Sequence, residues 1–166
     1  GYLPVEGRGD EPIRHITWFA ARDYCRWAGK RLPTEAEHER AVRGLDGRIW
    51  PWGEGGISCA KANYFTGASH CQGGPLLVGS HPEGDSVDGV RDLVGNVAEW
   101  TWDQFATSPA EETIDPNNVP QIHGAKVYRG GRWDDMPRFC RAAYRTGAGA
   151  SHRNAAVGFR PARTVP

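Results

Sequence analysis

A lone cysteine lies beside two aspartates in the segment VYRGGRWDDMPRFCRAAYR, residues 127–145. A cysteine thiolate can act as a nucleophile or bind a soft metal, and two neighbouring carboxylates can act as general acid and base. Consecutive residues on a strand point to opposite faces, however, so Asp134 and Asp135 cannot easily converge on one reacting atom. Free cysteine is among the most buried residue types, which favours a packed core thiol at Cys140 over a nucleophile. We therefore expect hydrogen-bonding contacts from Asp134 or Asp135 rather than a carboxylate dyad.

The remaining cysteines form no metal motif. The four cysteines, at positions 25, 59, 71 and 140, show no C-x-x-C spacing, which argues against a zinc site. Cys59 and Cys71 are twelve residues apart in a glycine-rich loop and could close a disulfide. Cys25 falls in a helical pattern typical of a buried small hydrophobe. The spacing alone leaves both the disulfide and the redox compartment open.

Two helices are predicted ahead of the C-terminal segment. Thr17 can cap the first, over WFAARDYCRWAG, and Gly29 can end it. In LPTEAEHERAVRG, Thr34 and Glu37 form an S/T-x-x-E capping box and Gly44 ends the second helix. The other acidic residues of its first turns are attributed to capping and to the helix dipole. The inward stripe expected on the first helix consists of Phe19, Ala20, Tyr24, Trp27 and Ala28.

From residue 49 onward the sequence is dense in Gly, Pro, Asn and Asp, which predicts turns and short strands. The lead-in before residue 13 is expected to be extended, and residues 104–124 to form a long surface loop. Strands are expected at residues 76–79, 98–102, 126–129, 140–144 and 157–161. No internal repeat or boundary stands out, so residues 1–166 are expected to form a single domain.

Composition excludes several classes of partner. Twenty basic residues balance twenty acidic ones, so the chain as a whole is not steered towards nucleic acid or an anionic membrane. No apolar run reaches membrane-spanning length and no signal-peptide pattern begins the chain. We expect a soluble protein, either cytoplasmic or exported after removal of a leader. The 22 glycines, 12 prolines and 7 tryptophans favour a loop-rich fold pinned by large aromatic side chains.

Four ordered blocks carry a family resemblance: ITWFAARDYCRWAGKRLPTEAEHERAVRG; WPWGE with ANYF; VRDLVGNVAEWTWD; and YRGGRWDD with CRAAYR and GFRPAR. Together they resemble the formylglycine-generating enzyme superfamily, also called the sulfatase-modifying-factor domain. The resemblance implies an α+β variant of the C-type lectin fold, with two helices, short antiparallel strands and long loops. It extends over residues 12–163, and the first part of the family domain is missing or shortened.

True formylglycine-generating enzymes use two cysteines of the last block to bind copper and oxidise a cysteine of a sulfatase. In this sequence the second of them falls on Cys140 and the first on Asp135, and a carboxylate is a poor substitute for a thiolate at a copper(I) site. Val42 and Pro161 stand where the family has disulfide cysteines. We therefore expect no copper and no formylglycine chemistry.

A second branch of the family makes ergothioneine and related compounds with non-haem iron, held largely by a helical domain with an H-x-x-x-H-x-E type pattern. The six histidines of this chain are scattered singly, so no iron is expected. The chain could still be the lectin-like half of such an oxidase.

A third branch comprises the variable proteins of diversity-generating retroelements, in which asparagine-type codons near the C-terminus vary at their adenines. Such codons never yield Lys, Glu, Gln, Met or Trp. Between Asp134 and Ala156 this sequence contains no Lys, Glu, Gln or Trp and one Met. An arginine-rich segment from a GC-rich genome would show similar depletion.

This branch implies a ligand-binding surface at the C-terminal face. Aromatic side chains there offer large contact area at low entropic cost, and polar side chains add directional contacts. The residues expected to contact a protein or small-molecule ligand are Trp133, Asp134, Asp135, Phe139, Tyr144, Thr146, His152, Asn154, Ala155 and Ala156. Neither nucleic-acid binding nor membrane insertion is expected.

The block DLVGNVAEW resembles a family calcium site. Asn96 and Glu99 would supply side-chain oxygens, and Val94 and Val97 would supply carbonyls, a mixed set of ligands that calcium tolerates. Such an ion would be structural. The alternative is that Asn96 makes a turn and Glu99 pairs with an arginine. A second family site, at ANYF, lacks an evident acidic partner.

The sequence therefore predicts a non-catalytic domain that binds a ligand through a diversified C-terminal surface. The alternative is a divergent formylglycine- or ergothioneine-type sulfur oxidase, or its lectin-like half. An accessory domain fused to a kinase or to a surface protein is a third possibility.

Overall fold

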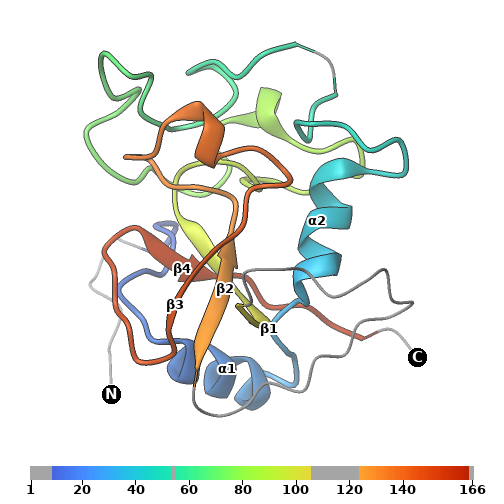
Figure 1. The fold of residues 1–166 in the computed structure, drawn as a ribbon, viewed down its shortest axis with the longest axis vertical. Helices are drawn as coiled ribbons and strands as arrows, with labels where there is room; N and C mark the ends of the chain where they lie inside the picture. Colours follow the sequence, from blue (N-terminus) through green and yellow to red (C-terminus); the bar gives the residue numbers. More distant parts are fainter. Residues whose placement is uncertain (1–8, 54, 106–123, 165–166) are drawn as a thin grey trace.

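The computed structural model describes residues 9–53, 55–105 and 124–164 (Figure 1). Most of the extended lead-in and most of the loop expected over residues 104–124 lie outside the described residues. Within the described residues no helix combines the length and apolar content needed to cross a membrane.

Both predicted helices are present, and their caps explain where they begin. Helix α1 spans Trp18–Trp27, and the Thr17 hydroxyl accepts a hydrogen bond from the Ala20 amide at its N-terminus. Helix α2 spans Glu35–Arg43, and the capping box between Thr34 and Glu37 is formed in both directions. These side chains satisfy amide groups that have no partner within the helix.

The face that α1 buries differs from the predicted stripe. Trp18, Ala21 and Cys25 are buried, whereas Tyr24 and Trp27 are 49% and 81% exposed. The i, i+3, i+7 spacing of the buried set points one face at the sheet, and the Trp18 indole nitrogen donates to the Thr101 carbonyl at 2.7 Å. The aromatic residues of the predicted stripe do not share one face of the helix: Phe19 is half-buried, whereas Tyr24 and Trp27 are exposed. For this reason the buried face was predicted wrongly.

Four strands form one small sheet in the order β3-β2-β1-β4 (Figure 1). Strand β1 pairs antiparallel with β2 and parallel with β4, and β2 pairs antiparallel with β3. The sheet is therefore mixed and not wholly antiparallel as expected. The strands are β1 at Ala98–Gln104, β2 at Ala125–Arg129, β3 at Thr146–Gly149 and β4 at Val157–Phe159.

Three predicted strands coincide with β1, β2 and β4, and two predictions are wrong. Residues 76–79 form no strand, and residues 140–144 follow the 3-10 turn η2, Pro137–Phe139, in a further turn in which the Tyr144 amide donates to the Arg141 carbonyl. Strand β3 was not predicted. Its sequence, TGAG, contains one β-branched residue and no aromatic one, so pairing with β2 and not local propensity forms it.

The core has two parts. Helix α1 packs on β1 and β4 around Trp18, Trp100 and Val157, all at most 2% exposed. Helix α2 and the loops pack around Val42, Leu93 and other residues of the second part. The loop segment of this second part is closed by a disulfide between Cys59 and Cys71, the pair that the spacing allowed.

Candidate functional site

The chain leaves β2 through two glycines and enters a turn that carries three of the predicted ligand contacts, Trp133, Asp134 and Asp135. The Trp133 amide donates to the Asn96 carbonyl at 2.9 Å, and the Asp135 amide donates to the Arg132 carbonyl at 3.0 Å. Asp134 and Asp135 therefore lie in a turn and not on a strand. The argument that they point to opposite faces of a strand was wrong.

Both carboxylates pair with Arg132. The carboxylate of Asp135 accepts from the Arg132 side chain at 2.9 and 3.1 Å and from its amide at 3.1 Å. The carboxylate of Asp134 lies 3.3 Å from the same guanidinium. Asp135 is thus held by three donors, and Asp134 is the more exposed of the two and the better placed to contact a ligand.

Cys140 lies beneath this turn as a fully buried thiol. Burial raises the pKa of the Cys140 thiol to about 12, and the nearby Asp135 carboxylate adds to the rise. Gly131, at φ +76°, packs so closely that a Cβ there would lie 2.6 Å from the Cys140 sulfur. The expectation of a packed core thiol at Cys140 is confirmed.

These residues do not fit a copper(I) ion. Copper(I) prefers two thiolate ligands, whereas this turn holds one thiol, Cys140, which is fully buried. The Asp135 oxygens, at the position of the missing thiolate, already accept hydrogen bonds from Arg132.

A loop from which no ligand contact was predicted supplies a second wall next to the turn. The Phe65 amide donates to the Asp135 carbonyl at 2.9 Å. The His70 ring lies 4.8 Å from the ring of Phe65 and 5.0 Å from that of Trp133, centroid to centroid. Both residues lie within the loop that the Cys59–Cys71 disulfide closes. Two sequence signals pointed to this loop, the spacing of these cysteines and the family block ANYF, which contains Phe65.

The other predicted contacts fall into two groups. Phe139 and Tyr144 pack ring on ring at 5.0 Å, beyond the turn. Thr146 lies in β3, and the loop from β3 to β4 carries His152, Asn154, Ala155 and Ala156. In Figure 1 this loop lies apart from the orange segment around η2, so the ten predicted residues do not form one patch.

Ala156 is a correction, because it is 3% exposed and its carbonyl accepts a hydrogen bond from the Ala98 amide at 2.9 Å. The side-chain oxygen of Asn154 is already used within the loop, since it accepts a hydrogen bond from the Ala156 amide at 2.7 Å. His152 and Ala155 remain exposed. Ala156 therefore belongs to the core side of this loop and cannot present its methyl group to a ligand.

A buried ionic network behind the site involves two acids that were attributed to capping. Glu35 and Glu39 each accept from the guanidinium of Arg129, at 2.7 Å, and Arg129 is 1% exposed. Glu35 also pairs with Arg145. The main partners of these two acids are arginines of the C-terminal half, so they fasten α2 to the sheet.

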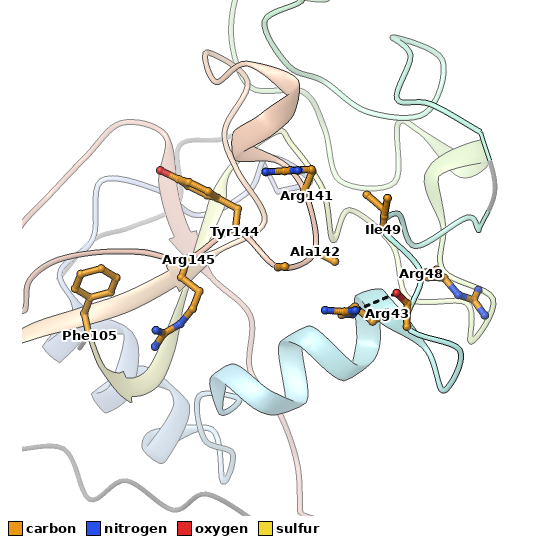
Figure 2. Close-up of a pocket in the computed structure, with 10 residues that line it drawn as sticks. Arg43, Arg48, Ile49, Phe105, Arg141, Ala142, Tyr144 and Arg145 are labelled. Atoms are coloured by element: carbon orange, nitrogen blue, oxygen red, sulfur yellow. Dashed lines mark hydrogen bonds between the residues drawn. The ribbon is translucent and has the colours of Figure 1, made fainter. Parts of the chain in front are cut away.

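Residues 141–145 also form one side of a pocket of about 420 Å³ (Figure 2). Arg43, at the C-terminal end of α2, lies on the facing side. Two hydrogen bonds hold the backbone of Ala142 in this lining: its amide donates to the Ile49 carbonyl at 3.2 Å, and its carbonyl accepts from the Arg129 guanidinium at 2.5 Å. Of the predicted ligand contacts, Tyr144 lines this pocket.

The residues expected to bind calcium have other partners. Both Glu99 oxygens accept from Arg160 at 2.8 Å, and the Asn96 side-chain oxygen accepts from the Leu76 amide at 2.8 Å. Val94 and Val97 are buried. As placed, these residues do not fit a calcium ion, and the described part of the chain holds no group of three or more His, Cys, Asp or Glu residues able to bind a metal.

Most of the chain is similar to a known protein family. Residues 3–165 match the model of the sulfatase-modifying factor enzyme 1-like domain. Hercynine oxygenase of Mycolicibacterium smegmatis is 38% identical over 149 residues, which cover 82% of this chain and 34% of the relative. The serine/threonine-protein kinase Pkn1 of Chlamydia trachomatis is 37% identical, over 99% of this chain and 26% of the kinase. The formylglycine-generating enzyme of Streptomyces coelicolor is 36% identical, over 89% of this chain and 50% of the enzyme.

The chain thus spans about a third or less of the first two of these relatives. Among solved structures, Treponema denticola variable protein 1 superimposes with a TM-score of 0.76 at 22% identity, over 95% of this chain and 73% of that protein. PvdO from Pseudomonas aeruginosa superimposes with a TM-score of 0.79 at 25% identity, over 96% of this chain and 64% of that protein.

Proposed function

This chain belongs to the sulfatase-modifying factor enzyme 1-like domain family, and from that premise we propose that it is a non-catalytic domain that binds a ligand through its C-terminal face. Family membership does not decide function, because one fold carries oxidases, kinase-associated domains and variable binding proteins. The chemistry of the site has to decide between them.

The observation that carries the proposal is the state of Cys140 and Asp135. The single thiol of the last block is sealed in the core, and the position of the second thiolate holds a carboxylate paired with Arg132. A copper-dependent oxidation needs both positions as accessible thiolates. The strand and turn that would perform this chemistry are retained as a rigid frame.

The surface above this frame has the composition of a binding surface. The Trp133 ring packs against the His70 ring, tilted by 49°, next to the exposed carboxylate of Asp134. Half-buried aromatic side chains combined with directional polar groups are typical of residues that dominate binding energy. The likeness in fold to Treponema denticola variable protein 1 supports the same role.

We further propose that the C-terminal face is diversified by substitution at the adenines of asparagine-type template codons. Asp134, His152 and Ala155 are exposed positions at which substitution would cost the fold little. Buried Ala156 is the exception, because a larger side chain there would have to displace core residues.

The test is a copper(I) titration of the purified protein in competition with a chromophoric chelator. We expect no tight binding and no change in Cys140→Ser, with Cys25→Ser as the matched control because Cys25 is also a buried free thiol. Tight copper(I) binding that Cys140→Ser abolishes and Cys25→Ser preserves would overturn the proposal.

A second function is favoured by the likeness to hercynine oxygenase, in which this chain would be the lectin-like half of an iron-dependent sulfur oxidase. Under that function the iron ligands would come from chain outside these residues. The two functions are separated by assaying the complete gene product for iron-dependent sulfoxide formation, which the binding proposal predicts to be absent.

A further inference from the structure

The pocket between α2 and residues 141–145 carries an inference about the class of ligand. We propose that it binds a phosphate or sulfate monoester carried on an apolar body. The inference rests on the proposed function as a ligand-binding domain and names the chemistry of one ligand subsite.

The polar lining of the pocket is cationic. Four arginines line it, and no acidic residue does; they are Arg43, Arg48, Arg141 and Arg145. Arginine presents a planar fork of donors that matches the oxygens of phosphate and sulfate groups. A concave surface with several such forks favours an oxyanion over a neutral ligand.

Two of the four arginines are neutralised by carboxylates behind the pocket wall. Arg48 forms a bidentate pair with Asp46 at 2.7 and 2.8 Å, and Arg145 forms one with Glu35 at 2.5 and 2.7 Å. These two side chains shape the pocket but offer little net charge to a ligand.

The other two arginines supply the charge. Arg141 is exposed, donates only to the Arg138 carbonyl at 3.3 Å, and has no ion pair within the described ranges. Arg43 pairs with Glu39, but the buried Arg129 takes the other oxygen of the same carboxylate. Within the described ranges Arg141 therefore has no carboxylate partner, and Arg43 shares the carboxylate of Glu39 with Arg129.

The rest of the lining is apolar, which specifies the body of the ligand. Ile49 is 59% exposed, and the Phe105 and Tyr144 rings lie on the side of the pocket that carries Arg145 (Figure 2). Tyr144 is fixed by its ring contact with Phe139, and the Arg145 guanidinium lies 5.8 Å from the Phe105 ring centroid. A ring or short alkyl group attached to the oxyanion would pack against these side chains.

The test is isothermal titration calorimetry with four probes: phenyl phosphate, phenyl sulfate, benzoate and inorganic phosphate. We expect phenyl phosphate or phenyl sulfate to bind more tightly than benzoate and inorganic phosphate, with an affinity that falls as salt is raised. Which of the two esters binds better identifies the oxyanion.

Arg141→Gln should weaken binding of the preferred ester by roughly tenfold, because a charge-assisted contact is lost while no internal ion pair is broken. Arg153→Gln is the matched control, since Arg153 is an exposed arginine of the β3–β4 loop outside the pocket, and it should change nothing. Both variants should keep the wild-type melting temperature.

Absence of ester binding at 10 mM probe, roughly the weakest affinity that calorimetry resolves, would overturn the inference. Equal affinity of wild type and Arg141→Gln, or inorganic phosphate binding as tightly as phenyl phosphate, would also overturn it. None of these results would touch the proposed function, which fails instead through tight copper(I) binding at Cys140.

Discussion

At the scale of single residues, His38 is a buried side chain whose polar atoms lack hydrogen-bond partners among the described residues. It is fully buried in α2, and neither ring nitrogen has a hydrogen-bond partner within the part of the chain that the structure describes. Burial lowers the pKa of His38 from 6.5 to about 3, and Arg129 and Arg160 add to the effect, while Glu35 opposes it. Glu99 lies 3.7 Å from its Nε2 atom. The folded protein therefore keeps His38 neutral.

This burial predicts acid sensitivity. In the unfolded chain His38 takes up a proton below its ordinary pKa of 6.5, whereas in the folded chain its pKa is about 3. The neutral His38 therefore does not reduce the free energy of unfolding above pH 6.5. As the pH falls below 6.5, the free energy of unfolding decreases by up to about 1.4 kcal/mol per pH unit. Urea unfolding at several pH values checks this.

The matched variants are His38→Gln and His152→Gln, since His152 is exposed. His38→Gln should flatten the dependence between pH 6.5 and 4, and His152→Gln should not. A wild-type slope that survives in His38→Gln would show that other groups cause the acid sensitivity.

At this scale the sequence predicted the chemistry of the site better than its geometry. Burial of Cys140 follows from the general behaviour of free cysteine, and the loss of a second thiolate is visible at Asp135. The partners of Asp135 and the burial of Ala156 depend on the turn after β2 and on the β3–β4 loop, whose courses local sequence does not determine.

At the scale of elements, the ionic network under α2 is the main polar tie between the helix and the sheet. Arg129 in β2 is 1% exposed and depends on Glu35 and Glu39 for its compensation. A buried charge that loses a partner is far more costly than an exposed one. Glu35→Gln should therefore lower the free energy of unfolding by about 3 kcal/mol.

Asp46→Asn is the control for this prediction, because Asp46 also pairs with an arginine but is exposed. It should leave the free energy of unfolding nearly unchanged. Denaturant titration of both variants checks the difference, and similar losses in the two would show that the buried network is not what ties α2 to the sheet.

The segment at residues 94–99, which leads into β1, gives a prediction about metal binding. Because Arg160 occupies both oxygens of Glu99, chelation of calcium should leave the melting temperature unchanged. A ligand that binds only the folded state would raise it. A fall in melting temperature on adding a chelator, absent in Glu99→Ala, would instead establish the calcium site that the family resemblance implied.

The elements that sequence predicted well are those with local signals. The caps at Thr17 and Thr34 located both helices, and the strands predicted at residues 98–102, 126–129 and 157–161 coincide with β1, β2 and β4. Strand β3 has no such signal, since its residues are held by pairing with β2. The buried face of α1 was misassigned because aromatic residues occur around much of its surface, and only contact with the sheet selects Trp18, Ala21 and Cys25.

At the scale of the whole molecule, the candidate site is a composite of segments distant in sequence. Trp133 and Asp134 come from the last block, whereas Phe65 and His70 come from a loop held by the Cys59–Cys71 disulfide. The family and the fold could be predicted because four blocks keep their order along the chain. The joining of the two segments could not be predicted, because it rests on contacts such as that between the Phe65 amide and the Asp135 carbonyl.

The most direct test of the account is to sequence the DNA around the gene. A diversified binding surface predicts a near-copy of the last hundred or so bases, roughly the length that encodes residues 127–160, close to a reverse-transcriptase gene. The copy should differ at adenines in codons for exposed residues such as Asp134, His152 and Ala155. An invariant gene joined to a histidine-rich helical domain, or set among genes of sulfur metabolism, would contradict the account and favour the oxidase.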